Sequence, residues 1–425
     1  MRILDVCLEN TLIGIITENR KGGRFSYDPE IVKQYAGAPV LSLSLPAKER
    51  PFGEAKTDHW FNGLLPEGPR REAICRNLGI NPYDWIGLLS EIGWECAGAV
   101  RVFSHGDAQN HPARYREIPK SILGEMLSST QTYLPGNENY PFRMSLGGFQ
   151  GKICICLPRL SAGEAYVDAD NALLPDGEAA STHILKPENT AVYPGLAESE
   201  AWAMAAASHA ARCSRVALLS LPNAPATLVV ERYDRTGEDW PQGARRMHQE
   251  DACQALGFDP SKKYANPHEA KGSDPTYKSI ANLLIKYAEN PEEELTELLR
   301  QMAINLALGN WDAHAKNISF LYRKLGIPTV APLYDVVPIA EIEPRTRYLS
   351  LRINGHIAPN DLEGKDIVAE AASWGMMYEK ASTILNECFD QLTVGIRAAR
   401  VIYPEAAKRH EANALARVAR LLRSL

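Results

Sequence analysis

The chain has 425 residues, which at roughly 150 residues per domain predicts two or three structural units. Hydrophobic residues make up 45% of the sequence and charged residues 23%, a globular composition that excludes wholesale disorder. The 46 Lys and Arg residues are outnumbered by 52 Asp and Glu residues, so the net charge of -6 gives no overall field that would attract nucleic acid. No stretch approaches the roughly 18 uninterrupted apolar residues of a membrane span, so we expect no membrane-spanning segment.

The eight cysteines include no Cys-x-x-Cys pair, which argues against a zinc ribbon or a thioredoxin-type redox site. Near the start, Asp5, Glu9 and Asn10 interrupt the apolar runs, unlike the unbroken apolar region of a signal peptide. We therefore expect a reduced, cytoplasmic protein that has no contact with a membrane.

The first part of the chain mixes strand-like runs with helical stretches. The expected strands are 4–7, 12–17 and 40–45, and the expected helices are 66–78 and 84–92. This mixture predicts a small α+β subdomain over residues 1–125.

The middle of the chain is richer in strands. These are expected at 153–157, 183–186 and 226–231, with one helix at 198–212. We assign residues 126–235 to the β-rich, nucleotide-binding part of an N-lobe.

Helical patterns dominate after residue 249. In the clearest helix, Asn290 can cap, Pro291 fits the first turn and Glu293 would complete a capping box. One apolar stripe follows at Leu295, Leu298, Leu299, Met302 and Leu306. Residues 236–425 are therefore expected to form a mostly helical C-terminal lobe that holds a catalytic loop, and the whole chain a two-lobed α+β enzyme with a cleft between the lobes.

The segment 310–317 follows this helix and carries the strongest chemical signal. Asp312 and Asn317 have the Asp-x-x-x-x-Asn spacing of a protein-kinase catalytic loop. There, the aspartate accepts the proton of the attacking hydroxyl and the asparagine oxygen binds Mg²⁺, which prefers oxygen ligands. The His-Arg pair that usually precedes the aspartate is absent, and this spacing alone also arises by chance.

Two further elements support the kinase interpretation. Asp335 follows an apolar approach, where a second metal-binding carboxylate would lie, although two valines replace the usual Phe-Gly. Upstream, Lys186 ends an expected strand, as does the lysine that pairs with nucleotide phosphates. Glu198 or Glu200 in the next helix could orient this lysine, and we favour Glu200.

A glycine-rich loop at 145–152 precedes the expected strand 153–157. Successive glycines allow backbone N–H groups to approach phosphate oxygens closely. The loop is not a Walker A motif, because its glycine spacing is one residue short and Ile153 stands where a Ser or Thr is required. A phosphate cradle and a plain tight turn both remain open for these residues alone.

Together, these motifs resemble the HipA family of bacterial serine/threonine kinases, the toxins of toxin–antitoxin systems. The resemblance covers nearly the whole chain. It rests on segments that run in family order, at 59–67, 145–152, 182–186, 230–235, 249–251, 312–317 and 334–335.

The resemblance implies a role for each matching residue. Asp312 would be the catalytic base, Asn317 and Asp335 would bind Mg²⁺, and Ser145 would be the site of an inactivating autophosphorylation. The nucleotide-binding residues would be Lys186, Glu231, Tyr233, Gln249, His314 and Tyr334, with Gly147, Gly148, Gly151 and Lys152 in the phosphate loop. Gly148 and Gly151 stand where relatives often carry Ala and Glu, so the grip of this loop on phosphate could differ.

The function that the resemblance implies is an ATP- and Mg²⁺-dependent protein kinase that phosphorylates an aminoacyl-tRNA synthetase and causes growth arrest. A small helix-turn-helix antitoxin would bind the chain, so that contact with DNA would be indirect. Two alternatives stay open: a kinase that acts on a lipid or small molecule, and an inactive binding module that helps a DNA-binding partner repress transcription.

Overall fold

The computed structural model describes residues 1–107, 112–130, 151–191, 193–266, 274–343 and 346–425. Ser145, Gly147 and Gly148 lie outside the described residues. Within the described ranges, no helix is both long enough and apolar enough to cross a membrane.

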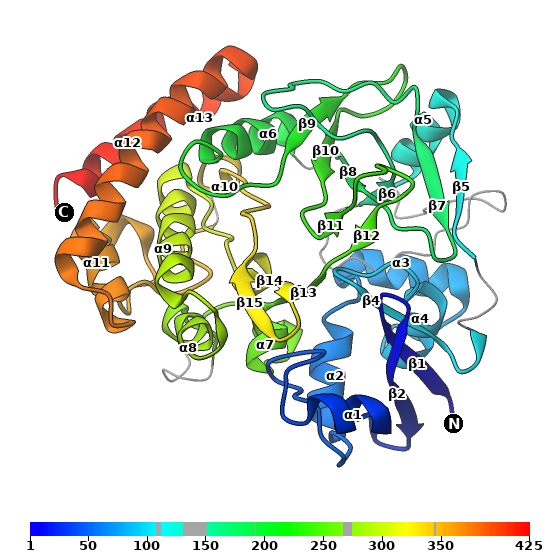
Figure 1. Cartoon of the computed structure of the whole chain (residues 1–425). Helices are drawn as coiled ribbons and strands as arrows, with labels where there is room; N and C mark the ends of the chain where they lie inside the picture. Colours follow the sequence, from blue (N-terminus) through cyan, green and yellow to red (C-terminus); the bar gives the residue numbers. More distant parts are fainter. Residues whose placement is uncertain (108–111, 131–150, 192, 267–273, 344–345) are drawn as a thin grey trace.

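The N-terminal subdomain is an antiparallel sheet with helices packed against it (Figure 1). The sheet has the order β3-β2-β1-β4, built from β1 (Ile3–Leu8), β2 (Thr11–Asn19), β3 (Gly22–Tyr27) and β4 (Val100–Ser104). The helices are α1 (Pro29–Tyr35), α2 (Glu54–Asn62), α3 (Gly68–Leu78) and α4 (Trp85–Ile92). Phe25, Trp60, Phe61 and Ile92 are fully buried between these layers and form part of a separate hydrophobic core.

The middle region is built on a second antiparallel sheet of order β6-β8-β10-β9. Its strands are β6 (Ile153–Ile155), β8 (His183–Pro187), β9 (Val216–Leu219) and β10 (Thr227–Glu231). Around it lie α5 (Lys120–Ser129), α6 (Leu196–Ala207), the pair β5 (Arg114–Glu117) and β7 (Leu173–Asp176), and the pair β11 (Arg235–Thr236) and β12 (Arg245–Arg246).

The C-terminal region is mostly helical and contains one small sheet. The sheet joins β13 (His248–Asp251), β14 (Ser319–Lys324) and β15 (Ile327–Val330) in that order. The helices are α7 (Ala252–Leu256), α8 (Tyr277–Tyr287), α9 (Pro291–Leu308), α10 (Ile339–Ile342), α11 (Gly364–Ser373), α12 (Tyr378–Ile402) and α13 (Pro404–Leu422). Short 3-10 helices occur at Pro260–Lys262, Ala315–Asn317 and Pro359–Asp361.

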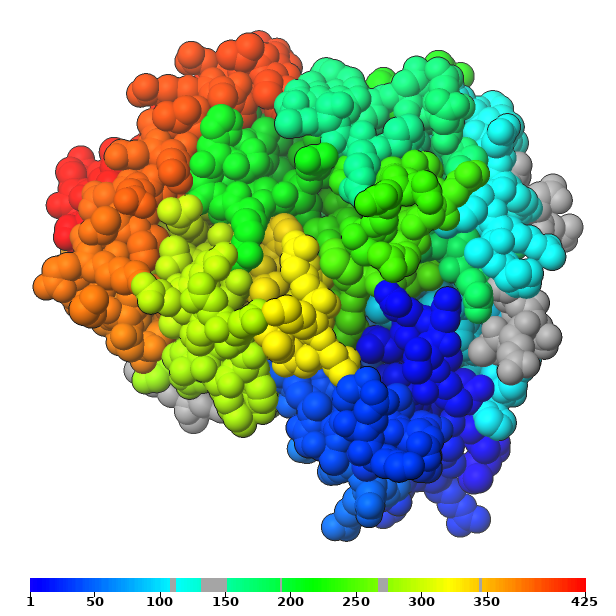
Figure 2. Space-filling view, in the orientation of Figure 1, coloured from blue at the N-terminus to red at the C-terminus, as the bar shows by residue number. Residues whose placement is uncertain are grey.

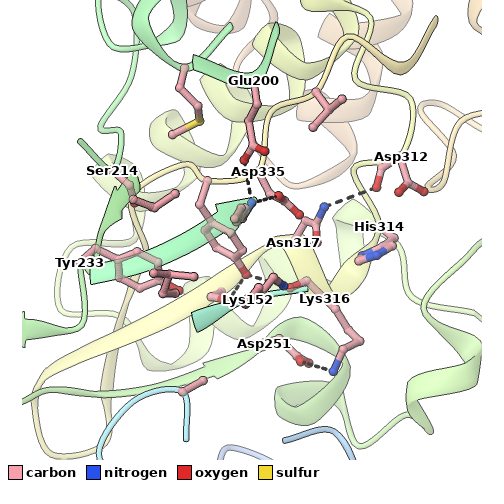
Figure 3. Close-up of a pocket in the computed structure, with 18 of the residues that line it drawn as sticks. Lys152, Glu200, Ser214, Tyr233, Asp251, Asp312, His314, Lys316, Asn317 and Asp335 are labelled. Atoms are coloured by element: carbon pink, nitrogen blue, oxygen red, sulfur yellow. Dashed lines mark hydrogen bonds and ion pairs between the residues drawn. The ribbon is translucent and has the colours of Figure 1, made fainter. Parts of the chain in front are cut away.

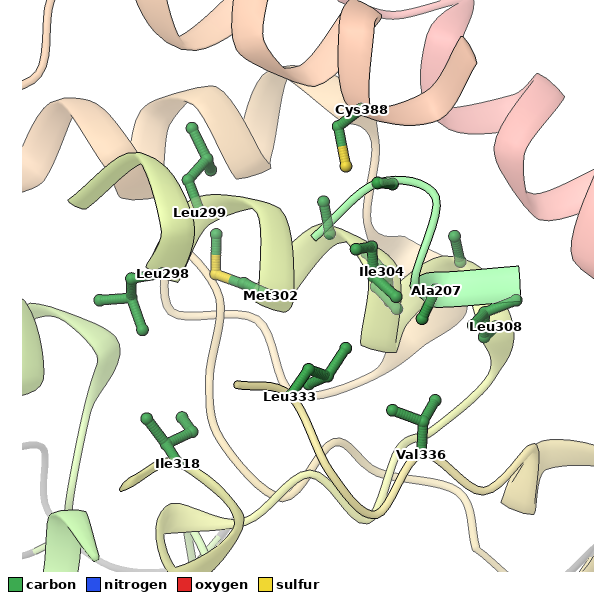
Figure 4. Close-up of a cluster of buried hydrophobic side chains, with 14 of the residues drawn as sticks. Ala207, Leu298, Leu299, Met302, Ile304, Leu308, Ile318, Leu333, Val336 and Cys388 are labelled. Atoms are coloured by element: carbon green, nitrogen blue, oxygen red, sulfur yellow. The ribbon is translucent and has the colours of Figure 1, made fainter. Parts of the chain in front are cut away.

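Helix α9 forms the centre of the C-terminal core. Its apolar stripe is buried, as the spacing predicts, and Leu298, Met302 and Leu308 face the loop residues Leu333 and Val336 (Figure 4). Burial of each such side chain stabilises the fold by roughly 1.5–3 kcal/mol. The segment 310–317 follows Leu308, and Asp335 lies between Leu333 and Val336, all three of which are buried in this core. The stripe therefore helps to fix the two segments relative to one another.

Two local expectations were wrong. Asn290 precedes α9, but its side chain makes no cap hydrogen bond, and its amide instead donates to Glu293 Oε2 at 3.2 Å. Residues 40–45 form a bend with one bridge between Ser42 and Leu45, not a strand. Side chains satisfy this backbone instead of a neighbouring strand, since Leu43 N–H donates to Glu250 Oε1 at 3.0 Å.

A buried charged cluster joins the N-terminal subdomain to the segment after β10. Glu95 binds Arg232 at 3.0 Å and Arg235 at 2.6 Å, and it also pairs with Arg246. Arg232 binds Asp234 at 2.8 Å. Burial opposes ionisation of Glu95, but the three arginines outweigh it and hold the pKa of this carboxyl well below its usual range. We call these five side chains the arginine cluster.

Candidate active site

A cavity of about 340 Å³ lies where the three regions meet. Most of the residues singled out from the sequence line it: Lys152, Lys186, Glu231, Tyr233, Gln249, Asp312, His314, Asn317, Tyr334 and Asp335. Figure 3 shows Asp312, Asn317 and His314 beside Asp335 and Glu200, although these residues come from separate segments. Gly151 is not among the lining residues and lies against Thr130 at the end of α5.

Lys186 is held between two carboxylates. It lies on β8, which pairs with both β6 and β10, and its Nζ donates to Glu200 Oε1 of α6 at 2.6 Å. It also pairs with Asp335. Glu198 instead contacts Arg409 at 3.4 Å, so Glu200 is the glutamate that orients this lysine. Its ammonium group is buried, and yet the two carboxylates raise the pKa of Lys186 above its usual range.

The pKa values of the two carboxyls that pair with Lys186 shift in opposite directions. Burial raises the pKa of Glu200 to about 7, and Lys186 only partly offsets this. Burial would also raise the pKa of Asp335, but Lys186 and Lys152 outweigh it and hold that pKa well below its usual range. Groups whose pKa values are pushed apart in one cavity are typical of catalytic sites.

The segment 310–317 begins where α9 ends. Gly309 caps the helix at φ 75°, and a side chain there would collide with Arg417 of α13. Arg417 also donates from Nε to the carbonyl of Ala307 at 2.8 Å and pairs with Glu341 of α10 at 2.6 Å. Arg417 of α13 therefore connects the end of α9 to α10.

Asn310 connects the loop to the second aspartate. Its Nδ2 donates to Asn305 Oδ1 at 2.7 Å and to the carbonyl of Asp335 at 3.1 Å. Asp335 itself has φ 78°, a left-handed conformation that is uncommon for a residue with a side chain. The Asn317 amide lies 3.5 Å from the carbonyl of Asp312. These contacts hold the Asp-x-x-x-x-Asn segment and the second aspartate in one fixed arrangement.

Asp312 lies in an environment that disfavours its charge. Burial and then the nearby Asp335 raise the pKa of Asp312 to about 6, while Lys263, Tyr264 and Ser350 partly offset that rise. Ser350 Oγ lies 3.4 Å from Asp312 Oδ1. A carboxylate with a pKa of this size can accept a proton near neutral pH more readily than an exposed aspartate.

His314 is neutral in this site. Burial lowers its pKa to about 3, so the ring carries no charge at physiological pH. Its Nδ1 is buried and has no hydrogen-bond partner among the described residues, and its ring meets Tyr264 edge-on at 5.1 Å between centroids. This favours a contact or orienting role over that of a catalytic acid.

The other end of the cavity is aromatic. The rings of Tyr233 and Tyr334 lie 5.4 Å apart, and the Tyr233 hydroxyl donates to Gln249. Glu231 lines the cavity, but its carboxylate accepts from Leu160 N–H at 2.8 Å and pairs with Arg159. This end offers flat apolar surface and hydrogen-bonding groups of the kind that a purine ring needs.

Lys152 adds a cation with an altered pKa. Burial and the neighbouring Lys186 lower the pKa of Lys152 to about 8. Its carbonyl accepts from Arg70 Nη2 of α3 at 3.0 Å. Lys152 is thus the last residue of the glycine-rich loop and lines the same cavity as Lys186.

Sequence reasoning gave no role to several residues that also line the cavity. These are Gly63, Leu64, Glu67, Asp251, Lys263, Tyr264 and Lys316. Gly63, Leu64, Glu67 and Asp251 fall within the motifs at 59–67 and 249–251, so a signal was present without an assignment. Lys263 and Tyr264 belong to no motif, and only the fold reveals their position.

The oxygen atoms of Asn317 and Asp335 suit a magnesium ion. Mg²⁺ is commonly held by one or two protein oxygens and completes its shell with water and substrate phosphates. Across the described ranges, no group of three or more His, Cys, Asp or Glu residues could hold a metal. Asn317 and Asp335 would together offer two such protein oxygens.

The comparisons with known proteins agree with this architecture. A crystal complex of HipA, HipB and operator DNA from Shewanella oneidensis matches the fold with a TM-score of 0.81 at 22% identity, over 99% of this chain and 97% of that chain. The two-lobed, protein-kinase-like α+β fold expected from the sequence is thereby confirmed.

Family and relatives then identify the chain more closely. The HipA N-terminal domain matches residues 4–103 and the HipA-like C-terminal domain matches residues 144–396. "Putative kinase Y4mE" of Sinorhizobium fredii is 31% identical over all of this chain and 99% of its own length. "Serine/threonine-protein kinase toxin HipA" of Shewanella oneidensis is 28% identical over 72% of this chain and 68% of its own. The chain belongs to the HipA family.

Proposed function

We propose that the protein is an ATP- and Mg²⁺-dependent serine/threonine kinase. The observation that carries this proposal is the convergence of Lys186, Asp312, Asn317 and Asp335 on one cavity, although they span more than a hundred residues of sequence. Phosphoryl transfer requires mainly positioning and charge neutralisation, and this set provides both.

Each residue has a role that its geometry supports. Lys186 would pair with ATP phosphates, since it is charged, buried and aimed into the cavity. Asp312 would orient the attacking hydroxyl and accept its proton at the carboxylate. Asn317 and Asp335 would hold Mg²⁺, which supplies charge neutralisation at the phosphates when bound. Tyr233, Gln249, His314 and Tyr334 would contact the nucleotide, with Glu231 beside the base.

The relatives suggest the cellular role. One is named a toxin kinase, and the structural neighbour is a complex with HipB and operator DNA. We extend this to the present chain: a small helix-turn-helix antitoxin would bind it and carry it to DNA. Its protein target would be a translation component such as an aminoacyl-tRNA synthetase, whose modification would arrest growth.

Autophosphorylation of Ser145 would switch the enzyme off. A phosphate there adds nearly two negative charges next to a loop that would hold ATP phosphates. Repulsion between these charges and the phosphates of ATP would expel the loop and stop turnover. A Ser145→Ala protein is expected to keep its activity after prolonged incubation with ATP, whereas the wild type loses it. Equal loss of activity in both proteins would contradict this role.

The decisive experiment compares the phosphoproteomes of cells that express wild type or Asp312→Ala. Phosphorylation of one or a few translation proteins only in the wild type would support the proposal and name the substrate. Purified wild type should also transfer the γ-phosphate of ATP to the protein identified. Transfer only to lipid or metabolite pools would favour a small-molecule kinase, and equal, negligible turnover in both proteins would favour a binding module.

A further inference from the structure

The segment between α2 and α3 of the N-terminal subdomain contributes to the wall of the cavity. Gly63, Leu64 and Glu67 line it, and Glu67 immediately precedes α3. A residue at this position often caps the helix with its side chain, but Glu67 makes no such hydrogen bond. Its carboxylate points instead at two lysines of the C-terminal lobe.

The first of these lysines is Lys263. Its Nζ lies 2.7 Å from Glu67 Oε2, and the lysine side chain is only 5% exposed. The carbonyl of Lys263 accepts from Ala315 N–H at 3.1 Å, so this residue is also bonded to the catalytic loop. The next residue, Tyr264, packs edge-on against His314 of the same loop. Glu67 thereby fixes a lysine whose backbone supports the loop.

The second lysine lies within the catalytic loop itself. Lys316 Nζ donates to the carbonyl of Gly63 at 2.7 Å and to Asp251 at 3.0 Å, and lies 3.8 Å from Glu67 Oε1. Figure 3 shows Lys316 directed toward Asp251, with its backbone beside Asn317. Lys316 follows Asp312 by four residues and precedes Asn317, so its anchoring sets the position of both.

The charges in this contact are balanced. Glu67 and Asp251 face Lys263 and Lys316, and all four side chains are less than a fifth exposed. Removal of one carboxylate would leave a buried lysine without full compensation, which is costly in a low-dielectric site. Three residues along α3, Arg70 holds the carbonyl of Lys152, so the same turn also contacts the end of the glycine-rich loop.

We propose that Glu67 is a positioning residue for phosphoryl transfer: through Lys263 and Lys316, the N-terminal subdomain holds the catalytic loop in its working geometry. This inference deepens the proposed function and rests on it. The N-terminal subdomain is then an integral part of the active site, and Glu67 acts without touching the reacting atoms.

The test uses the full chain and the variants Glu67→Gln and Glu67→Asp. Glu72→Gln is the matched control, because Glu72 is exposed on the same helix. Hydrogen–deuterium exchange over residues 309–318 is expected to speed up severalfold in Glu67→Gln and less in Glu67→Asp, which retains the charge. Exchange in α12 should stay unchanged in both. Unchanged exchange in the loop of Glu67→Gln would overturn the inference, whether or not the protein turns over ATP.

Kinetics provide the second measurement. Loss of loop geometry should lower kcat of Glu67→Gln about tenfold and leave the KM for ATP within about twofold, since a small displacement mainly affects the chemical step. If Glu67 acts through Lys263, the double variant Glu67→Gln/Lys263→Met should be no slower than the slower single variant. Losses that multiply in the double variant would show that the two residues act independently and would contradict the inference. Absence of phosphoryl transfer in the wild type would count against the proposed function, and the exchange experiment would still decide the role of Glu67.

Discussion

Two of the buried charge clusters, the arginine cluster and the carboxylates around Lys186, differ in how their charges are compensated. In the arginine cluster, Glu95 and Asp234 are each matched by arginine forks, with contacts at 2.6–3.1 Å. Around the cavity, Lys186 pairs with Glu200 and Asp335, and Lys152 also lowers the pKa of Asp335. The pKa of Asp312 stays raised although Lys263 partly offsets the rise. In the first cluster both carboxylates are paired with arginines, whereas in the second the pKa values of Glu200 and Asp312 stay raised, so that a bound cation could compensate these carboxylates. Arg232 and Asp234 of the arginine cluster also line the cavity, so neither burial of charge nor nearness to the cavity indicates function by itself. Carboxylates whose pKa values stay raised do.

The largest expected effect comes from Asp312→Asn. Phosphoryl transfer should fall by about a thousandfold, equivalent to about 4 kcal/mol, because the amide cannot accept the hydroxyl proton. The melting temperature should not fall, since burial already disfavours the Asp312 carboxylate in the folded state. Asp361→Asn, at an exposed position, is the control. Comparable kcat in the two variants would break the assignment of Asp312 as base.

Glu95→Gln should lower the stability of the fold and leave nucleotide binding unchanged. It leaves three buried arginines around a neutral amide, and removal of one partner of such a network costs about 3 kcal/mol or more. Urea unfolding measures this loss, and Glu91→Gln on the exposed face of α4 is the control. The folded fraction should keep its KM for ATP. A stable Glu95→Gln protein with impaired nucleotide binding would show that the arginine cluster serves nucleotide binding and is not only structural.

Lys186→Met, in contrast to Glu95→Gln, should impair catalysis more than stability. We expect kcat/KM for ATP to fall about a hundredfold, or roughly 2.7 kcal/mol, because the phosphates lose their buried cation. Stability should change less than in Glu95→Gln, since Glu200 has a pKa of about 7 and can take up a proton when its partner is removed. Steady-state kinetics and urea unfolding on one preparation test both expectations. A larger stability loss than that of Glu95→Gln would show that this network is structural too.

The smallest expected effect is a pH dependence. The pKa of Glu95 is lower in the folded than in the unfolded chain, where it is roughly 4.3. Its contribution to stability is therefore complete above that pH and is lost as pH falls toward the folded value. The stability difference between wild type and Glu95→Gln should shrink by about 1 kcal/mol between pH 7 and pH 3.5. A difference that is constant over this range would contradict the low pKa of Glu95.

Much of this site could be predicted because its residues lie in short, ordered motifs. Lys186 at a strand end, Asp312 and Asn317 five apart, and Asp335 after an apolar approach all come together in the cavity. The β14–β15 hairpin between Asn317 and Asp335 was not predicted, although it brings these two residues back to the same place. The role of Ser145, Gly147 and Gly148 stays a prediction, because these residues lie outside the described ranges.

Contacts between distant segments could not be read from local patterns. Glu67 and Lys263 are separated by 196 positions, and Glu95 and Arg235 by 140. Neither pair leaves a periodicity or a spacing signal in the sequence. Similarly, the strand expected at 40–45 failed because a distant carboxylate, Glu250, binds its backbone, which no local propensity reveals.

The hold that Arg417 has on the end of α9 and on α10 has a practical consequence for handling the protein. Its hydrogen bond to Ala307 and its ion pair with Glu341 attach α13 to the end of α9 and to α10. A polypeptide shortened before Arg417 would lose both contacts, and with them the support of the helix end from which the segment 310–317 starts, so we expect little turnover from it.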